Sequence, residues 1–527
     1  MTRGHDKFLH APRPGIAKLR DCKSINRENP TVAETFKNYI NGQWVGAHSG
    51  ATFENRNPAD MHDLIGTFPQ SSATDVEMAA AAAAEAFRQW RLVPAPKRGD
   101  ILRRAGDILA RRKDELARHM TREMGKPVFE TKGDVQEAID TAYYAATETR
   151  RLFGYNTPSE MANKVNLSFR MPVGVCGIIT AWNFPMAVPS WKILPALACG
   201  NTIVYKPSED APHSGNLMAE VLDEAGIPHG VFNVVHGAAE CGAAIVEHPA
   251  TKVIGFTGST QVGNEIASRA GAMNKKVSLE MGGKNAQIVM PDADMDLALD
   301  GVLWGAFGTT GQRCTATSRL ILHASIYDDF INRLITRAGR LKIGPGLAEG
   351  TEMGPVINEK QIRRIEEYVR IGRQEDGATC VLGGDRATDT AETANGWFFK
   401  PTIFIDVTRD MRIAREEIFG PVLSVLKASD LTEAIDILND TPYGLSSSLY
   451  TANVNDAFRA IRDIEAGITY INVPTIGAEA HMPFGGVKGT GNGHREGGWT
   501  VFDIFTEWKT VYIDYSGSLQ RAQIDNY

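Results

Sequence analysis

The chain of 527 residues is long enough to form about three domains and to bury large apolar cores. Its 43% hydrophobic and 23% charged residues are typical of a soluble globular protein. The net charge of -7 gives no general basic field, which argues against nucleic acid as a partner.

Cysteine spacing and hydropathy exclude further classes of protein. The six cysteines are scattered, with no CxxC pair and no metal-ligand spacing. This pattern predicts free thiols in a reducing compartment, which we take to be the cytoplasm, and no metal site. No apolar run reaches the ~20 residues that a membrane-spanning helix needs, so we expect no membrane partner.

The N-terminal extension, residues 1–37, is rich in Arg and Lys but has no apolar stretch of the kind that a secretory signal contains. An organelle transit peptide remains an alternative, although Asp6, Asp21 and Glu28 argue against it. We favour a polar arm that lies on the surface.

The first part of the chain carries no chemical signature and is predicted to be scaffold. Two short strands around an Asn-Gly turn are expected at residues 39–44. Apolar periodicity predicts three helices, the second of which ends at Gly125 and Pro127. These helices are expected at residues 71–90, 98–124 and 134–153.

From about residue 165, short apolar runs alternate with helical patterns. This alternation predicts parallel sheets covered by helices on both faces, with ligands at the carboxyl ends of the strands. A first block of strands is expected at residues 173–180, 202–206, 231–236, 252–257 and 276–280. A second block is expected at residues 285–290, 318–323, 401–405, 422–427, 446–450 and 468–472. The two α/β units are therefore predicted to meet near residues 280–284.

Two segments on either side of this junction could share one reaction. Gly311 to Cys314 offer a single thiol among small polar residues, and Glu280 precedes two glycines that would let the backbone approach a ligand. A thiol attacks an electrophilic carbon only as a thiolate, and a carboxylate can take a proton from that thiol or from water. A lone cysteine is more often a small buried apolar residue, so the pair depends on neighbouring motifs for support.

Further motifs surround this pair in a fixed order. They are Trp182 to Pro185, Lys206 to Glu209, Phe256 to Thr260, Glu417 to Pro421 and Pro483 to Gly486. Together with the glutamate and cysteine segments, this order resembles the NAD(P)-dependent aldehyde dehydrogenase superfamily over residues 39–515. Three of the motifs come directly after predicted strands, where a parallel sheet binds its ligands.

The resemblance implies an α/β fold of two Rossmann-like domains and a β arm that joins a neighbouring subunit in a homodimer or homotetramer. The implied boundaries are 38–165 and 173–281 for the NAD-binding domain, 282–500 for the catalytic domain, and 166–172 and 501–515 for the oligomerisation arm. The C-terminal tail, residues 516–527, is either frayed or docked on a partner subunit.

The cofactor region carries neither the GxGxxG fingerprint nor the GxxxxGK[ST] phosphate loop. Residues 258–263 form instead a Gly/Ser turn that opens a helix, which could meet a pyrophosphate or serve as an ordinary helix cap. The resemblance implies that Ser259 contacts the pyrophosphate, and that Glu417 and Phe419 hold the nicotinamide ribose and ring. Further implied cofactor contacts are Ile179, Trp182, Ser208, Gly258 and Gly282.

Lys206 and Glu209 are implied to hold the adenosine ribose. An ammonium donor and a carboxylate acceptor suit two adjacent hydroxyls, and a carboxylate repels a 2′-phosphate. We therefore expect NAD as the cofactor, with NADP left open as the alternative.

The resemblance also implies a covalent mechanism that turns an aldehyde into the carboxylic acid. The Cys314 thiolate attacks the aldehyde, and the thiohemiacetal gives a hydride to the nicotinamide. Glu280 then activates the water that hydrolyses the thioester. Asn183 is implied to donate its amide to the developing oxyanion, together with the backbone N–H of Cys314.

The substrate is less sharply defined by the sequence. Residues 472–479 and His481 resemble the branch that includes 2-oxoglutarate-semialdehyde and aminoadipate-semialdehyde dehydrogenases. Arg313 could pair with the distal carboxylate of a semialdehyde, or it could brace the nucleophile loop from behind. Phe184 is expected to wall the substrate site, although a plain core aromatic residue would need no function.

Three other interpretations stay open. A CoA-acylating dehydrogenase is disfavoured by the presence of Glu280, because acylating relatives commonly lack that base. A non-catalytic structural protein on the same scaffold is disfavoured by the intact Cys314, Glu280 and Asn183. A cysteine hydrolase would need a partner histidine such as His236, but no cysteine-protease signature surrounds the thiol.

Overall fold

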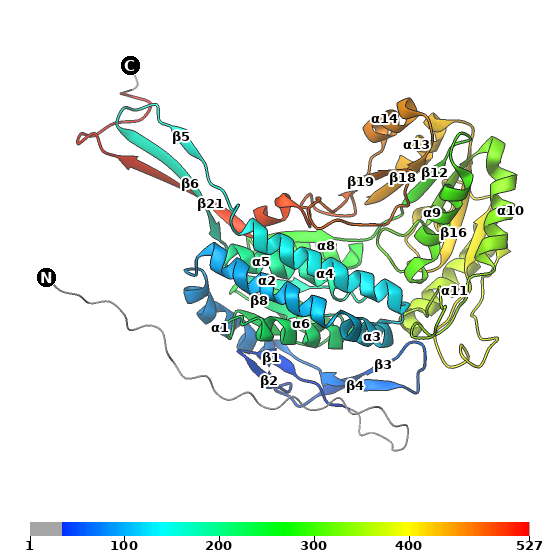
Figure 1. Cartoon of the computed structure of the whole chain (residues 1–527), viewed down its shortest axis with the longest axis horizontal. Helices are drawn as coiled ribbons and strands as arrows, with labels where there is room; N and C mark the ends of the chain where they lie inside the picture. Colours follow the sequence, from blue (N-terminus) through cyan, green and yellow to red (C-terminus); the bar gives the residue numbers. More distant parts are fainter. Residues whose placement is uncertain (1–33, 526–527) are drawn as a thin grey trace. The chain divides into compact units, whose positions relative to one another are not determined.

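The computed structural model of the chain describes residues 34–525. These residues form two seven-stranded sheets covered by helices, together with three smaller sheets (Figure 1). Of the predicted N-terminal extension only residues 34–37 are described, and there the backbone N–H of Phe36 donates to the carbonyl of Thr67. The expectation of a polar arm over the preceding residues falls outside the described part of the chain.

The first sheet has the strand order β11-β10-β7-β8-β9-β1-β2. Its five parallel strands are β7 (Val175–Ile179), β8 (Thr202–Lys206), β9 (Phe232–Val234), β10 (Thr251–Thr257) and β11 (Lys276–Glu280). The hairpin expected around the Asn-Gly turn is present as β1 (Asn38–Ile40) and β2 (Gln43–Val45). It adds to the edge of the sheet through an antiparallel pairing of β1 with β9.

Helices bury both faces of this sheet. Successive side chains of a strand point to opposite faces, so each strand contributes side chains to two packing layers. On β7, Val175 and Ile179 pack into one layer, whereas Cys176 and Ile178 pack into the other. The first layer contains α1 (Ala73–Trp90), α7 (Ala239–Glu247) and α8 (Thr260–Ala272). The second contains α2 (Ala95–Arg111), α3 (Lys113–Met124), α4 (Val128–Glu148), α5 (Ala187–Cys199) and α6 (Pro212–Glu224).

The prediction of a single helix over residues 98–124 is wrong, because the structure has two helices there, α2 and α3, which meet at Arg112. Arg112 has φ -93° and ψ 8°, and its Nη2 pairs with Glu115 at 2.7 Å and with Glu220 at 2.9 Å. Buried Leu109 and Leu116 lie on either side of the break, so apolar periodicity continues across it and gives no sign of it. The next helix, α4, also begins six residues earlier than the predicted residue 134.

The second sheet has the strand order β14-β15-β16-β13-β12-β18-β19 and is parallel except for β14. Its strands are β12 (Ala286–Val289), β13 (Arg319–His323), β14 (Thr379–Leu382), β15 (Thr402–Ile405), β16 (Val422–Ala428), β18 (Ser446–Tyr450) and β19 (Ile468–Ile471). One face packs against α9 (Met295–Phe307) and α10 (Tyr327–Ala338). The other packs against α11 (Glu359–Gln374), α12 (Arg412–Arg415), α13 (Leu431–Asn439) and α14 (Val454–Asp463).

A three-stranded antiparallel sheet stands apart from the two large sheets (Figure 1). Its strands are β5 (Asn156–Pro158), β6 (Lys164–Pro172) and β21 (Thr506–Asp514), so the two extended segments predicted from the sequence pair with each other. Trp508 and Tyr512 of β21 are exposed. The tail contacts the loop between β5 and β6, where the Gln520 amide donates to the carbonyl of Ala162 at 2.7 Å.

The remaining elements are short. They are β3 (Thr52–Arg56), β4 (Leu64–Pro69), β17 (Tyr443–Gly444), β20 (Val487–Lys488), η1 (Gly308–Gly311), η2 (Ala324–Ile326) and η3 (Trp499–Asp503). Within residues 34–525, no helix combines the length and the apolar character needed to cross a membrane.

Candidate active site

The predicted site residues lie where loops after the strands of the first sheet meet loops before the strands of the second. Two adjacent cavities of about 230 and 590 Å³ occupy this junction and share Trp182, Gly258 and Ser259. The smaller cavity is also lined by Asn183, Gly282, Cys314, Glu417 and Phe419. The larger is also lined by Ile179, Lys206, Ser208 and Glu209. All ten cofactor candidates therefore line one of two neighbouring spaces, and Cys314 and Asn183 share one of them.

Cys314 follows a tight left-handed turn and is half-buried. The Asn285 amide donates to the carbonyl of Cys314 at 2.7 Å, which fixes the backbone at the thiol. Burial, and then the nearby carboxylates of Glu280 and Glu417, raise the pKa of Cys314 to about 12. In this form of the protein the thiol is protonated at neutral pH, so attack requires a base or a nearby positive charge.

Asn183 lies beside the thiol with its side chain almost fully buried. Its Nδ2 donates one hydrogen bond to the carbonyl of Gln312 at 3.1 Å. A side-chain amide carries two N–H groups, so a second donor remains for an oxygen that enters the cavity.

Glu280 ends β11 and is 4% exposed. Neither of its carboxylate oxygens has a hydrogen-bond partner among the described residues. Burial raises the pKa of Glu280 to about 8, although the positive charges of Lys192 and Arg495 oppose the shift. Such a carboxylate is suited to exchange a proton near neutral pH.

Gly485 explains how Glu280 fits, because a Cβ at this position would lie 2.4 Å from Oε1 of that carboxylate. The φ of Gly485 is +145°, a conformation that residues with a side chain rarely adopt. The Pro-Phe-Gly-Gly motif thus provides backbone without a side chain next to the base.

Sequence reasoning missed Lys192 and its buried partner Glu496. Lys192 is 1% exposed on α5, where its Nζ forms an ion pair with Glu496 and donates to Thr257 at 2.5 Å. Burial lowers the pKa of Lys192 to about 7, while the carboxylate of Glu280 opposes that shift. The available signal was a single charged residue in a helix that is otherwise apolar except for Ser190, because burying such a charge is costly unless it has a partner.

The glycines after Glu280 make room for protein groups of the same site. The backbone N–H of Gly283 donates to Oε1 of Glu417 at 3.0 Å, and a Cβ at Gly282 would lie 2.4 Å from the other oxygen. A Cβ at Gly283 would lie 2.6 Å from the carbonyl of Cys314. The two glycines therefore let the backbone approach Glu417 and the nucleophile loop closely.

Aromatic and polar contacts complete the smaller cavity. The rings of Trp182 and Phe419 meet edge to face, with centroids 5.6 Å apart. Gln361 donates to the carbonyl of Phe419 at 2.8 Å, and Arg364 donates to that of Glu417 at 2.5 Å. Gln361 and Arg364 also line the cavity, and neither was identified from the sequence.

The larger cavity is lined by groups whose chemistry suits a dinucleotide. Ser259 is the N-cap of α8, so the free N–H groups of that helix start at the cavity wall and suit a pyrophosphate. Lys206 places its Nζ 3.3 Å from Oε2 of Glu209, which sets a donor beside an acceptor as two ribose hydroxyls require. Ile179 and Phe256 supply apolar walls.

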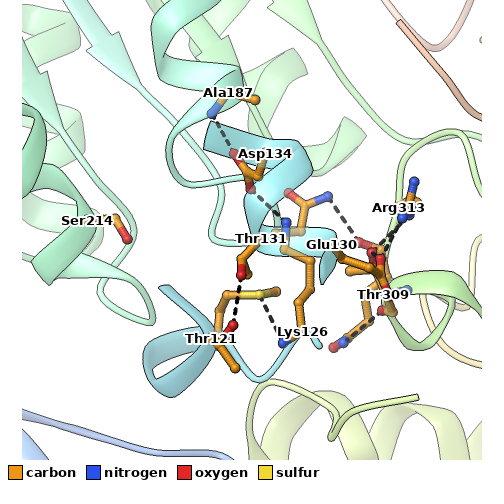
Figure 2. A network of polar contacts seen from close by, with 12 residues as sticks. Thr121, Lys126, Glu130, Thr131, Asp134, Ala187, Ser214, Thr309 and Arg313 are labelled. Atoms are coloured by element: carbon orange, nitrogen blue, oxygen red, sulfur yellow. Dashed lines mark hydrogen bonds and ion pairs between the residues drawn. The ribbon is translucent and has the colours of Figure 1, made fainter. Parts of the chain in front are cut away.

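Three of the predicted site residues, Glu280, Arg313 and Phe184, are not among the described residues that line these two cavities. The Arg313 Nη2 pairs with Glu130 at 2.6 Å, and its Nε donates to the hydroxyl of Thr309 at 2.9 Å (Figure 2). Its guanidinium lies 5.4 Å from the centre of the Phe184 ring, and the Nζ of Lys126 lies 3.8 Å from the same ring. These contacts brace the segment before Cys314.

The segment that resembles the semialdehyde branch lies against α4. Glu479 and His481 line a further cavity of about 530 Å³ together with Glu137 and Asp140. Burial, and then Asp134, raise the pKa of Glu137 to about 8. The lining of this cavity is therefore rich in carboxyl groups.

Comparison with known proteins agrees with this geometry. Residues 44–511 match the family model described as "Aldehyde dehydrogenase family". The chain is 41% identical over 484 residues to an alpha-ketoglutaric semialdehyde dehydrogenase of Bacillus subtilis (strain 168), covering 92% of this chain and 99% of the relative. It is 40% identical over 469 residues to malonate-semialdehyde dehydrogenase 2 of Geobacillus kaustophilus (strain HTA426), covering 89% of this chain and 96% of the relative.

A solved structure matches the fold over nearly the whole described chain. The betaine aldehyde dehydrogenase of Staphylococcus aureus in complex with NAD+ superposes with a TM-score of 0.89 at 34% identity, covering 92% of this chain and 96% of that chain. Fold, site and sequence similarity lead to the same assignment. The chain belongs to the aldehyde dehydrogenase family.

Proposed function

We propose that this aldehyde dehydrogenase oxidises a semialdehyde to the corresponding acid with NAD, using Cys314 as the nucleophile and Glu280 as the base. The observation that carries the proposal is the smaller cavity, where Cys314 and Asn183 share one space with Glu417 and Phe419. When bound, NAD supplies the hydride acceptor. The residues of this chain form the bond to the aldehyde, bind the oxyanion and activate the water.

Cys314 and Asn183 act on the aldehyde carbonyl. The thiol of Cys314 first releases its proton to water, a loss that the positive charge of a bound nicotinamide would favour. The Sγ then forms the bond to the carbonyl carbon, and the developing oxyanion accepts from the free N–H of Asn183 and from the backbone N–H of Cys314. Loss of one such donor typically costs ~3–4 kcal/mol in the transition state. The hydrogen bond from Asn183 to Gln312 supports this role, because it fixes the orientation of the amide before a substrate enters.

Glu280 takes a proton from water, whose oxygen then attacks the acyl carbon of the thioester. The bond from that carbon to the Sγ of Cys314 breaks, which releases the acid and returns the thiolate. Its pKa of about 8 means that the carboxylate form becomes more populated as the pH rises toward that value. Protonated Lys192 favours the carboxylate, although its own pKa of about 7 lies below that of Glu280. The absence of a hydrogen-bond partner on either oxygen, within residues 34–525, leaves both oxygens ready to accept from water.

Cofactor choice follows from the charges around the larger cavity. Glu209, Asp210 and Glu240 line it and would repel a 2′-phosphate. Arg269, which also lines it, already pairs with Glu247 and Glu265 at 2.5 and 2.6 Å. These contacts support NAD over NADP.

A semialdehyde substrate is supported by the names of the relatives, which act on alpha-ketoglutaric and malonate semialdehydes. Such substrates carry a carboxylate, and Arg313 is the cation nearest to the nucleophile in sequence. Its pairing with Glu130 supports the bracing role instead, because a substrate carboxylate would have to share or displace that partner. For Arg313 we therefore propose the bracing role.

Two alternatives predict different products. A CoA-acylating enzyme would require CoA to release the acyl group, and a non-catalytic structural protein would form no NADH. We would measure NADH absorbance with straight-chain aldehydes, aromatic aldehydes and semialdehydes, each with and without CoA. NADH formation without CoA, with the highest kcat/KM for a semialdehyde, supports the proposal. Strict dependence on CoA, or no NADH with any aldehyde, contradicts it.

Assembly and location belong to the same proposal. The sheet of β5, β6 and β21 serves as the oligomerisation arm of a homodimer or homotetramer, and the exposed Trp508, Tyr512 and Ile513 support this role. The domain boundaries given above and a cytoplasmic location complete it, and the latter is tested by cell fractionation. Light scattering that showed a monomer at micromolar concentration would contradict the assembly.

A further inference from the structure

The turn before the nucleophile has an unfavourable backbone conformation. Thr309, Thr310 and Gly311 have consecutive φ values of 51°, 57° and 67°, which places all three in the left-handed region. Threonine is branched at Cβ and rarely adopts this conformation. Two such residues in succession remain in place only where their surroundings hold them there.

Glu130 provides the most direct hold on this turn (Figure 2). Its Oε1 accepts from the backbone N–H of Thr309 at 3.0 Å, and its Oε2 accepts from the hydroxyl of the same residue. Oε2 also accepts from Nη2 of Arg313 at 2.6 Å, four residues further along the loop. The Glu130 side chain is 1% exposed, so water competes little for these bonds.

The contacts of Glu130 lead directly to the reacting groups. Residues 309–313 carry Gln312, whose backbone N–H donates to the carbonyl of Thr309 at 3.0 Å and whose own carbonyl accepts from Asn183. Cys314 lies two residues after Gln312. A shift of the turn would therefore move both the thiol and the amide that we assign to the oxyanion.

We propose that Glu130 is a positioning residue that holds the left-handed turn in place and thereby fixes Cys314 relative to Asn183. This inference rests on the proposed function for the roles of those two groups. It also gives Arg313 a defined task, because the guanidinium neutralises the buried carboxylate while it ties the two ends of the turn together.

The carboxylate form is essential to this role. Glu130 accepts from three donors, which its two oxygens can do when ionised. A glutamine at this position would keep one acceptor oxygen but turn an NH2 group toward donors of Thr309 or Arg313. The turn would then lose at least one of its ties while a donor remained unsatisfied in a buried site.

The test compares Glu130→Gln with Glu123→Gln. Glu123 is a matched control, because its carboxylate is also buried and also accepts from three donors, the backbone N–H groups of His213 and Ser214 and the Ser214 hydroxyl. That cluster tethers the start of α6, and none of these three hydrogen bonds of Glu123 reaches the turn. Both variants are expected to lose thermal stability.

Only Glu130→Gln is expected to change the chemistry at the thiol. We expect its NADH burst to slow by ~10²-fold, the usual effect of misplacing a reacting group by about 1 Å, with little change in the KM for NAD. We also expect faster alkylation of Cys314 by iodoacetamide without cofactor, measured by peptide mass spectrometry, because a loosened turn exposes the thiol. Glu123→Gln should match the unaltered enzyme in burst and alkylation.

A second substitution tests whether strain is the cause. Glycine adopts the left-handed region without penalty, so Thr309→Gly placed in the Glu130→Gln background should restore part of the lost burst rate. Unchanged burst and alkylation rates in Glu130→Gln, equal changes in the Glu123→Gln control, or no rescue by glycine would each overturn the proposal. If Glu130→Gln does not fold, Glu130→Asp carries the same comparison, because it keeps the charge but withdraws the carboxylate by one methylene.

The alkylation experiment separates the two levels of inference. If the unaltered protein oxidised no aldehyde, the proposed function would fail, yet the reactivity of the Cys314 thiol would still report whether Glu130 holds the turn.

Discussion

The fit between Gly485 and Glu280 gives a sharp prediction for Gly485→Ala. The added Cβ would lie 2.4 Å from Oε1 of Glu280, whereas ordinary contacts begin at 3.4 Å, so the carboxylate must move by the difference, 3.4 − 2.4 = 1.0 Å. A displacement of about that size can cost ~10²-fold in rate. The φ of +145° adds ~1–3 kcal/mol of backbone strain, which should appear as a lower Tm.

The assay separates thioester formation from its hydrolysis. Rapid mixing with aldehyde and NAD should show that Gly485→Ala keeps most of the NADH burst, because thiol attack does not require the carboxylate in its hydrolytic position. Steady-state turnover should fall by ~10²-fold, because hydrolysis does require that position.

Gly493→Ala is the matched control for backbone strain alone. Gly493 has φ +94°, and a Cβ there would meet no atom within 4 Å. It should lose stability but keep steady-state turnover. Equal turnover in Gly485→Ala and Gly493→Ala would refute the argument that Gly485 makes room for the base.

Three further predictions concern cofactor, substrate and pH. The unaltered enzyme should have a higher kcat/KM with NAD than with NADP, and Glu209→Gln should narrow the difference; a clear preference for NADP would contradict this. Arg313→Ala should raise KM for a semialdehyde acid far more than for a neutral aldehyde of equal length if Arg313 reads a carboxylate, whereas equal losses identify a bracing residue. Because burial raises the pKa of Glu280 to about 8, hydrolysis-limited turnover should rise as the pH approaches that value. Glu280→Gln should lack this rise, and a flat profile in the unaltered enzyme would count against Glu280 as the base.

Local patterns predicted the fold class and most of its elements, because burial on both faces of a parallel sheet leaves short apolar runs between amphipathic helices. The strands β8, β11 and β18 coincide with the predicted residues 202–206, 276–280 and 446–450. The hairpin of β3 and β4 was missed, because Thr52–Arg56 is mostly polar and only one of its residues is buried. A strand of that composition carries little of the periodic signal on which the prediction depends.

The candidate site was predictable where one short motif carries both a chemical group and the backbone that places it. Glu280 with its two glycines is such a case. The partners of Lys192 and Arg313 were not predictable in this way, because Glu496 and Glu130 lie 304 and 183 residues away along the chain. Such pairs arise only when the sheets and helices are assembled, so no local spacing records them.

The most direct test of the central claim is the fate of the acyl group on Cys314 in a Glu280→Gln enzyme. The substitution keeps size and hydrogen bonding but removes the base, so hydrolysis should slow by ~10²–10⁴-fold. Rapid mixing should release up to one NADH per active site and then almost stop, and mass spectrometry should find an acyl group on Cys314 but none in a Cys314→Ala control. Unchanged steady-state turnover in Glu280→Gln, or an acyl group on another residue, would contradict the account.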